Sequence, residues 1–143
     1  KWKLLNLHLK SKWTERKDDP DASIRREREA RAIRDYLRKS NPPESNPQYL
    51  VVGDFNDHRN SSTLRRFLEV NDTPLTSMVP CEDSRGHRWT HHWAKADSYS
   101  RFDYILATPL MLKKLVVGSA KIVDGPNSVL ASDHRMIFAD FQF

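Results

Sequence analysis

The sequence contains a single cysteine, Cys81, so an internal disulfide is impossible and a zinc site made of several thiolates is excluded. It also lacks an apolar run as long as a membrane span, and we expect no stable insertion into a bilayer. No signal peptide is visible, and the chain starts at Lys1 rather than at a methionine, so we expect its natural start to lie upstream. The compartment therefore stays open, with the cytoplasm slightly favoured.

The 143 residues contain no internal repeat and no low-complexity linker, which fits one domain or a piece of one. Basic residues are in excess: the formal net charge is +5 and the sequence pI is about 9.5. Such an excess attracts polyanions, namely nucleic acid, phosphorylated metabolites or an acidic lipid surface. Charge alone does not choose among them, and a basic protein without any such ligand has the same composition.

The first part of the chain predicts a strand, a loop and a helix. Residues 2–10 alternate between leucines on one face and partly polar residues on the other, as expected for a strand. Residues 11–22 are charged and contain Pro20, so we expect a loop. A helix should begin at Ser23 and end at residues 40–43. Its apolar stripe consists of Ala30, Ile33 and Leu37.

Charged residues cover the remaining surface of this helix. Glu27 and Arg31, and likewise Asp35 and Lys39, are four positions apart, so we expect ion pairs along the exposed side. The other lysines and arginines of residues 10–39 are expected to face solvent.

The second part of the chain predicts more strands around one short helix. Residues 49–52 form a strand buried on both faces, and a helix follows Asn60 or Ser61. Further expected elements are a turn at 85–87, a helical turn at 109–115, and strands at 89–93, 101–107, 116–123 and 136–143. This order is typical of an α/β layered domain with a mixed sheet.

Polar residues interrupt apolar runs at several strand ends. Asp54 follows the buried strand, Asp103 lies within an apolar run, His8 lies near the end of the first strand, and Asp133 and His134 precede the last one. A carboxylate in such surroundings costs several kcal/mol unless it is paired or bound to a metal. Because chemistry collects at the carboxyl ends of strands in α/β folds, these residues are candidates for one site.

Each candidate also has a structural interpretation. Asp54 and Asn56 are residue types that cap turns and helices, and Asp103 has Arg101 nearby as a potential partner. The adjacent pair His91 and His92 would point to opposite faces of a strand, which makes a poor metal pair. The histidines that we expect at the surface or in packing positions are His58, His87, His91 and His92.

The motifs taken together resemble the endonuclease/exonuclease/phosphatase superfamily. They are LLNLHLKSK (4–12), GDFN (53–56), FDYIL (102–106) and SDH (132–134), in that order. The superfamily includes deoxyribonuclease I, apurinic-site endonucleases, inositol polyphosphate 5-phosphatases and neutral sphingomyelinases. The resemblance implies a deoxyribonuclease I-like four-layer αββα sandwich. Family members carry a metal-binding asparagine and glutamate upstream of the histidine strand, so residues 1–143 resemble the C-terminal part of the domain, incomplete at its N-terminal side.

The resemblance also implies hydrolysis of a phosphoester by in-line attack of water. Asp54 would orient and deprotonate the water, and Asn56 would donate a hydrogen bond to the water or to a phosphoryl oxygen. His134 would contact a non-bridging oxygen, Asp103 would fix the tautomer of that histidine, and His8 would be a second donor to the phosphate.

A divalent cation is implied as cofactor, usually magnesium, with manganese as an alternative. Asp54, Asn56 and Asp133 offer the hard oxygen ligands that magnesium prefers, and Asp133 would share the ion with the upstream glutamate.

Substrate and partners remain less determined. A nucleic acid fits the basic charge, and Trp89, Trp93 and Tyr99 are potential stacking groups for bases, although aromatic residues are more often core. The alternatives are a phosphatase or phosphodiesterase acting on inositol phosphates or sphingomyelin, and a catalytically dead module that only binds phosphate. The missing N-terminal part of the domain is an expected partner, and an exposed sheet edge would permit self-association.

Overall fold

The computed structural model describes residues 1–143, apart from the side chain of Val129. The helices are α1 (Ser23–Ser40), α2 (Ser62–Leu68), α3 (Pro109–Leu112) and α4 (Ser128–Ala131). The strands are β1 (Lys3–His8), β2 (Tyr49–Asp54), β3 (Glu69–Val70), β4 (Thr73–Pro74), β5 (Ser77–Met78), β6 (His91–Trp93), β7 (Ser98–Ser100), β8 (Asp103–Ala107), β9 (Lys121–Ile122) and β10 (Ile137–Phe138). Among these described elements, none of the helices is long and apolar enough to cross a membrane.

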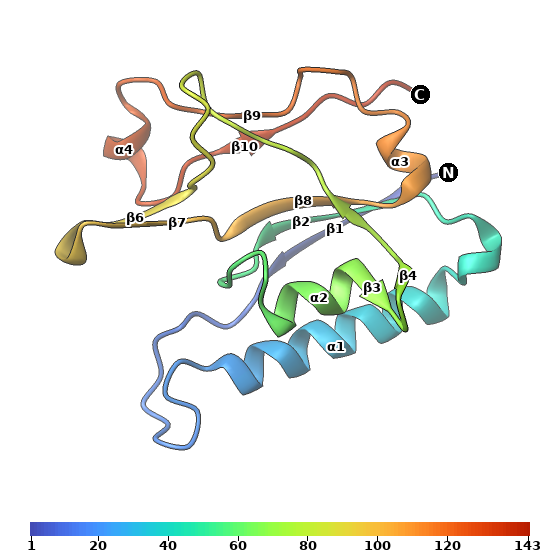
Figure 1. The fold of residues 1–143 in the computed structure, drawn as a ribbon, viewed down its shortest axis with the longest axis horizontal. Helices are drawn as coiled ribbons and strands as arrows, with labels where there is room; N and C mark the ends of the chain where they lie inside the picture. The colour runs from blue at the N-terminus through green and yellow to red at the C-terminus, as the bar shows by residue number, and fades with distance from the viewer.

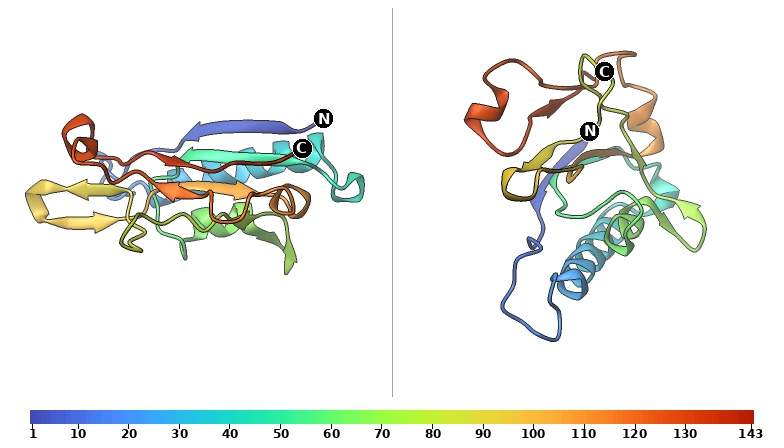
Figure 2. Two further views of the ribbon diagram at one scale, coloured as in Figure 1. Left: turned by 90° about the horizontal axis from the view of Figure 1, so that it is seen from above. Right: turned by 60° about the vertical axis from the view of Figure 1, so that its left-hand side comes forward.

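A four-stranded mixed sheet with the order β1-β2-β8-β5 forms the centre of the molecule. β1 and β2 are parallel, whereas β8 runs antiparallel to both β2 and β5. Helices α1 and α2 cover one face of this sheet, and the β9–β10 ribbon lies over the other (Figure 1). The succession of helix, sheet and ribbon is also visible in Figure 2. The predicted α/β layers and mixed sheet are therefore confirmed.

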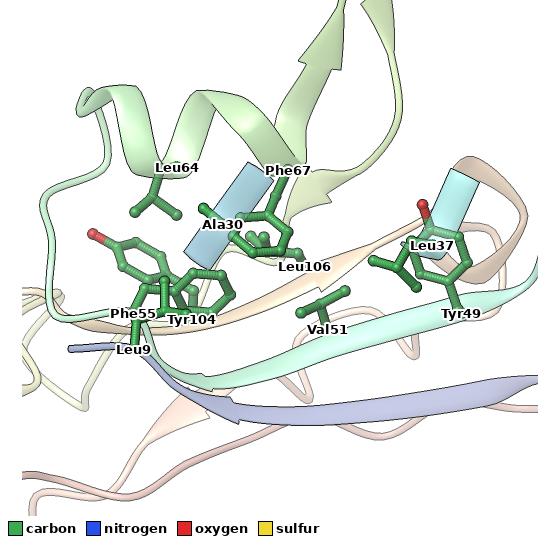
Figure 3. Packing of buried hydrophobic residues seen from close by; sticks show 10 residues of the cluster. All are labelled: Leu9, Ala30, Leu37, Tyr49, Val51, Phe55, Leu64, Phe67, Tyr104 and Leu106. Atoms are coloured by element: carbon green, nitrogen blue, oxygen red, sulfur yellow. The ribbon is translucent and has the colours of Figure 1, made fainter. Parts of the chain in front are cut away.

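The core on the helical face is built from the apolar residues that the periodicity indicated. Ala30 and Leu37 of α1 are buried against Val51 of β2 and Leu106 of β8 (Figure 3). From α2, Leu64 and Phe67 complete the cluster. The Ser61 hydroxyl caps the start of this helix by accepting from the N–H of Leu64.

The opposite face of the sheet is only partly covered. Leu50 and Ile105 pack there with Ile122 of β9, but a groove of about 800 Å³ remains open along β1. Trp2 and Leu4 line this groove and are 44% and 52% exposed. The groove ends at Asp103 and His134, so it leads to the polar strand ends.

The ion pairs of α1 differ from the predicted ones. Glu27 pairs with Arg66, because α2 packs across α1 and brings that guanidinium within reach. Asp35 pairs with its neighbour Arg34 at 2.7 Å. We expected the basic residues of this segment to face solvent, but Arg26 is buried, with 1% of its surface exposed.

Two of the predicted strands are much shorter in the structure, and residues 116–119 form a turn instead. Within residues 116–123 only Lys121 and Ile122 are extended in a ladder, since the amide and hydroxyl of Ser119 both donate to the carbonyl of Val116 and Gly118 adopts a φ of +78°. Within residues 136–143 only Ile137 and Phe138 pair regularly. Hydrophobic content alone gave the wrong prediction for residues 116–123, because the hydrogen bonds of Ser119 form a turn there.

Candidate active site

A row of polar residues crosses the sheet at one end. His8 is the register partner of Asp54, and Asp54 is the register partner of Asp103. Partners in register point to the same face of a sheet, so the three side chains lie side by side. Nε2 of His8 is 3.5 Å from Oδ2 of Asp54. This row lies where β1 and β2 end and β8 begins (Figure 1).

His134 reaches this row from the loop before β10. Its Nδ1 is 2.8 Å from Oδ2 of Asp103, and its Nε2 is 3.9 Å from Oδ2 of Asp54. Asp54, Asp103 and His134 offer ligand atoms that all lie within 4.8 Å of one another. Residues about 50 and 30 positions apart in the chain therefore meet in one cluster, at the end of the open groove.

Gly53 explains how β2 delivers Asp54 to the cluster. Its φ is +130°, and a Cβ built there would lie 2.0 Å from the carbonyl oxygen of Leu7 in β1. Only glycine allows this close approach of the two backbones. The glycine of the GDFN motif is thus required by the pairing of β1 with β2.

Asn56 holds the Asp54 carboxylate. Its backbone N–H donates to Oδ1 of Asp54 at 2.8 Å, and its side-chain amide donates to Oδ2 at 3.0 Å. The same amide nitrogen donates to the carbonyl of Leu9 at 3.0 Å. Asn56 has a φ of +50°, a left-handed conformation that asparagine tolerates better than most residues. Both carboxylate oxygens are therefore oriented from one residue.

A buried ion pair supports the loop that follows. Nε of Arg26 donates to Oδ2 of Asp57 at 3.3 Å, and its Nη1 donates to the carbonyls of Lys10 and Asp21. Asp57 is 7% exposed. α1 is thereby connected to the loops that directly follow His8 in β1 and Asp54 in β2, and the second of these loops carries Asn56.

Thr90 connects the two other motifs. Its buried hydroxyl accepts from the backbone N–H groups of Phe102 and Asp103, at 3.0 and 3.1 Å. Its carbonyl accepts from the N–H of Arg135 at 2.7 Å. One residue thus fixes both the start of β8 and the segment that carries His134.

The Arg135 side chain anchors the segment that carries His134. Its Nη1 donates to Asp83 at 2.9 Å, its Nη2 donates to the carbonyl of Trp89 at 2.6 Å, and its guanidinium carbon lies 3.5 Å from the centre of the Trp89 ring. Burial raises the pKa of Asp83, but the hydrogen bonds from Arg135 and from the backbone of His87 and Arg85 outweigh it and hold that pKa well below its usual range.

His91 belongs to this region, and the prediction that it is only a surface or packing residue missed that position. Its ring centre is 4.7 Å from that of His134, and its Nε2 is 3.7 Å from Oδ2 of Asp133. His92 points to the other face, where it stacks on Tyr99 at 4.4 Å. The alternation along β6 was predicted correctly. Which face of β6 lies toward Asp103 depends on the pairing of β6 with β7, and the spacing of single residues does not give that pairing.

Asp133 occupies the rim of the site. Its carboxylate is 71% exposed, and it forms a second group with His91 and His134 rather than joining the group around Asp54. His58 and His87 lie near Lys12 and Asp83 respectively, outside both groups. Among the predicted residues, His8, Asn56 and His134 therefore each lie next to Asp54, Asp103 is bonded to His134, and Asp133 lies beside them.

Burial is the main electrostatic influence in the site. It raises the pKa of Asp54, the Asp103 charge adds to this, and the Asn56 amide and the two histidines oppose it. Burial also lowers the pKa of His91, and the proximity of His134 lowers it further. A carboxylate with a raised pKa is a better proton acceptor, and a neutral imidazole at His91 avoids repulsion with His134.

The site offers acidic and histidine ligands to a metal ion. Asp54 and Asp133 offer carboxylate oxygens and Asn56 retains its amide oxygen, whereas thiolates are absent from the described site. Magnesium is usually held by one or two carboxylates, with waters and substrate phosphate oxygens in the other positions. The two carboxylates belong to different ligand groups, Asp54 with Asp103 and Asp133 with His91, and His134 is common to both groups.

The Endonuclease/Exonuclease/phosphatase family model matches residues 7–134. This is most of the chain, and the protein belongs to that family, so the predicted resemblance is confirmed. No curated protein matches the chain.

Solved structures share the fold. The endonuclease/exonuclease/phosphatase from Bacteroides vulgatus matches with a TM-score of 0.62 at 19% identity, over 87% of this chain and 46% of that chain. A functionally unknown conserved protein from Enterococcus faecalis V583 matches with a TM-score of 0.63 at 16% identity, over 97% of this chain and 49% of that chain. The deoxyribonuclease I-like fold is therefore confirmed. The chain spans about half the length of these structures, and the assignment of residues 1–143 to the C-terminal part of one domain stays a prediction.

Proposed function

We propose that the protein hydrolyses phosphoesters with the help of magnesium and that its substrate is a nucleic acid. The observation that carries the proposal is the contact of Asp54 with the His134–Asp103 pair at the end of the groove. Membership of a family whose name joins nucleases and phosphatases supports the same chemistry, since both cleave phosphate esters.

Asp54 is the proposed acceptor of the proton from the attacking water. Its raised pKa suits this role, because a general base works best when its pKa approaches the working pH. Asn56 acts on Asp54, since its amide nitrogen already donates to that carboxylate and to Leu9. This differs from the role predicted from sequence, in which Asn56 donates to the water or the phosphoryl oxygen.

His134 is the proposed donor to a non-bridging phosphoryl oxygen. Asp103 accepts from Nδ1, which leaves Nε2 to face the substrate. His8 is 73% exposed and free to approach a second phosphoryl oxygen from the neighbouring strand end. Such donors stabilise the negative charge that develops in the transition state.

Asp54, Asn56 and Asp133 are the proposed ligands of the ion, through their side-chain oxygens, with manganese as an alternative to magnesium. When bound, the ion offsets negative charge on the phosphoryl oxygens.

The open groove beside β1 suggests where the rest of the domain lies. We infer that a further part of the protein covers Trp2, Leu4 and the apolar face next to them, because the solved structures are about twice as long as this chain. β1 is an edge of the sheet, so pairing of two copies through β1 is the competing outcome. Size-exclusion chromatography of the full-length protein distinguishes them, since a clean monomer contradicts the pairing.

The activity is tested by assaying the full-length protein with magnesium and with chelator. The substrates are supercoiled DNA, abasic duplex, RNA, inositol phosphates and sphingomyelin. We expect magnesium-dependent cleavage of a nucleic acid that weakens as salt rises. Cleavage of only an inositol phosphate or sphingomyelin would contradict the substrate assignment. Phosphate binding without any cleavage would indicate a catalytically inactive binding module.

A further inference from the structure

A second groove of about 540 Å³ opens beside the cluster of Asp54, Asp103 and His134. Asn56 and His91 form the side of the groove that is shared with the cluster. The loop after β1 and the β6–β7 hairpin form its other sides, and both segments project beyond the same end of the sheet (Figure 1). Its volume is within the usual range of ligand sites.

Aromatic rings line this groove and remain accessible. Trp13 is 74% exposed and Trp93 is 54% exposed, although large aromatic side chains are normally buried. Phe102 is buried at the base, with the His91 ring stacked on it at 5.2 Å. The hairpin alternation explains the contrast, because His92 and Tyr99 stack on the other face and leave the Trp93 face to the groove.

Polar groups accompany the rings. Nζ of Lys12 lies 5.1 Å from the centre of the Phe102 ring and 3.1 Å from Nε2 of His58. Ser98 and Ser100 line the hairpin wall. Hydroxyl groups and a cation next to flat rings suit a planar ligand with hydrogen-bonding edges and a nearby negative charge. An alkyl chain would not use them.

We propose that this groove binds the base of the nucleotide next to the scissile phosphate, by stacking on Trp13 and Trp93. The proposal rests on the proposed function, which places the phosphate at Asp54 and His134. It adds that the protein recognises an unpaired base, because a base has to leave the duplex stack before it can stack on Trp13 and Trp93 in the groove.

Calorimetric titration of the full-length protein in chelator tests the groove without any turnover. Thymidine 5′-monophosphate should bind about five-fold or more tightly than deoxyribose 5-phosphate. Trp93→Ala and Trp13→Ala should lower the affinity for the nucleotide toward that of the sugar phosphate and leave the sugar phosphate unchanged. The matched control is Tyr36→Ala, which removes a ring that is 64% exposed on α1 and should change neither affinity.

Two results would overturn the inference. One is equal affinity of the wild-type protein for the two ligands, even if it cleaves nucleic acid. The other is tighter binding of hexyl phosphate than of the nucleotide, which would indicate a site for an alkyl chain. Discrimination for the base without hydrolysis of any phosphoester would instead overturn the proposed function and leave the groove assignment standing.

Discussion

The carboxylate of Asp103 accepts a hydrogen bond from Nδ1 of His134 at 2.8 Å, although the two residues come from different motifs. This contact fixes the ring so that Nε2 points toward Asp54, 3.9 Å away. The orientation of the imidazole therefore depends on an acceptor at position 103.

Asp103→Asn should lower kcat by roughly two to four orders of magnitude, because the amide can donate to Nδ1 and favour the wrong tautomer. The measurement is the rate of magnesium-dependent hydrolysis by the full-length protein. Asp97→Asn is the matched control, since Asp97 lies 3.4 Å from His92 on the far side of the hairpin and should be dispensable. Equal rates for Asp103→Asn and wild type would remove Asp103 from the mechanism.

Gly53→Ala should destabilise the protein by more than about 1 kcal/mol and reduce activity, because the new Cβ would collide with the Leu7 carbonyl and displace Asp54. Gly86→Ala is the control: Gly86 also has a positive φ, of +81°, but its Cβ would meet no described atom within 4 Å. Urea unfolding measures both. If the two variants lost equal stability, the collision would not be the cause.

Thr90→Val should cost about 1–3 kcal/mol, because the N–H groups of Phe102 and Asp103 lose their acceptor without a change of side-chain shape. Thr63→Val is the matched change. Thr63 is equally buried, and its hydroxyl has no hydrogen-bond partner among the described residues. Thermal unfolding should therefore show a clear loss for Thr90→Val and none for Thr63→Val, and the reverse order would contradict the assignment.

Acid should weaken the fold through Asp83. Its folded pKa is depressed, so the ionised carboxylate contributes stability above its unfolded pKa of about 3.9, and this contribution is lost as the pH falls toward the folded value. Asp83→Asn should cost about 3 kcal/mol at neutral pH, since it leaves the buried Arg135 guanidinium unpaired, and should flatten the acid dependence.

Unfolding free energies measured from about pH 5 down to about pH 1 follow this loss. Asp18→Asn is the control, because Asp18 forms its ion pair with Arg16 on the exposed surface and should change little. A wild-type profile that Asp83→Asn leaves unaltered would show that another group causes the acid sensitivity.

Much of the fold follows from local patterns in the sequence. The leucine alternation of β1, the apolar stripe of α1 and the buried run of β2 appear in the structure close to their predicted bounds. β1 and α1 show the periodicity of elements with one buried face, and β2 shows the continuous apolar run of a strand that is buried on both faces, so these local signals are sufficient. The segment after Val116 was mispredicted because hydrogen bonds of Ser119 make a turn where the residue types suggest a strand.

The candidate site was only partly predictable. Asp54, Asp103 and His134 are visible as polar residues next to apolar strands, where a partly buried charge requires a partner. The roles of Arg26 and His91 depend on which surfaces α1 and the β6–β7 hairpin turn toward the site. Such tertiary pairings have no local signature, and both residues therefore resembled ordinary surface positions.

Magnesium-dependent hydrolysis of nucleic acid by the Asp54→Asn and His134→Ala variants of the full-length protein tests the central claim most directly, with circular dichroism to verify folding. The account predicts that both variants stay folded and lose at least about a hundred-fold in rate, because one lacks the proton acceptor and the other the donor to the phosphoryl oxygen. Wild-type rates from either folded variant would contradict it.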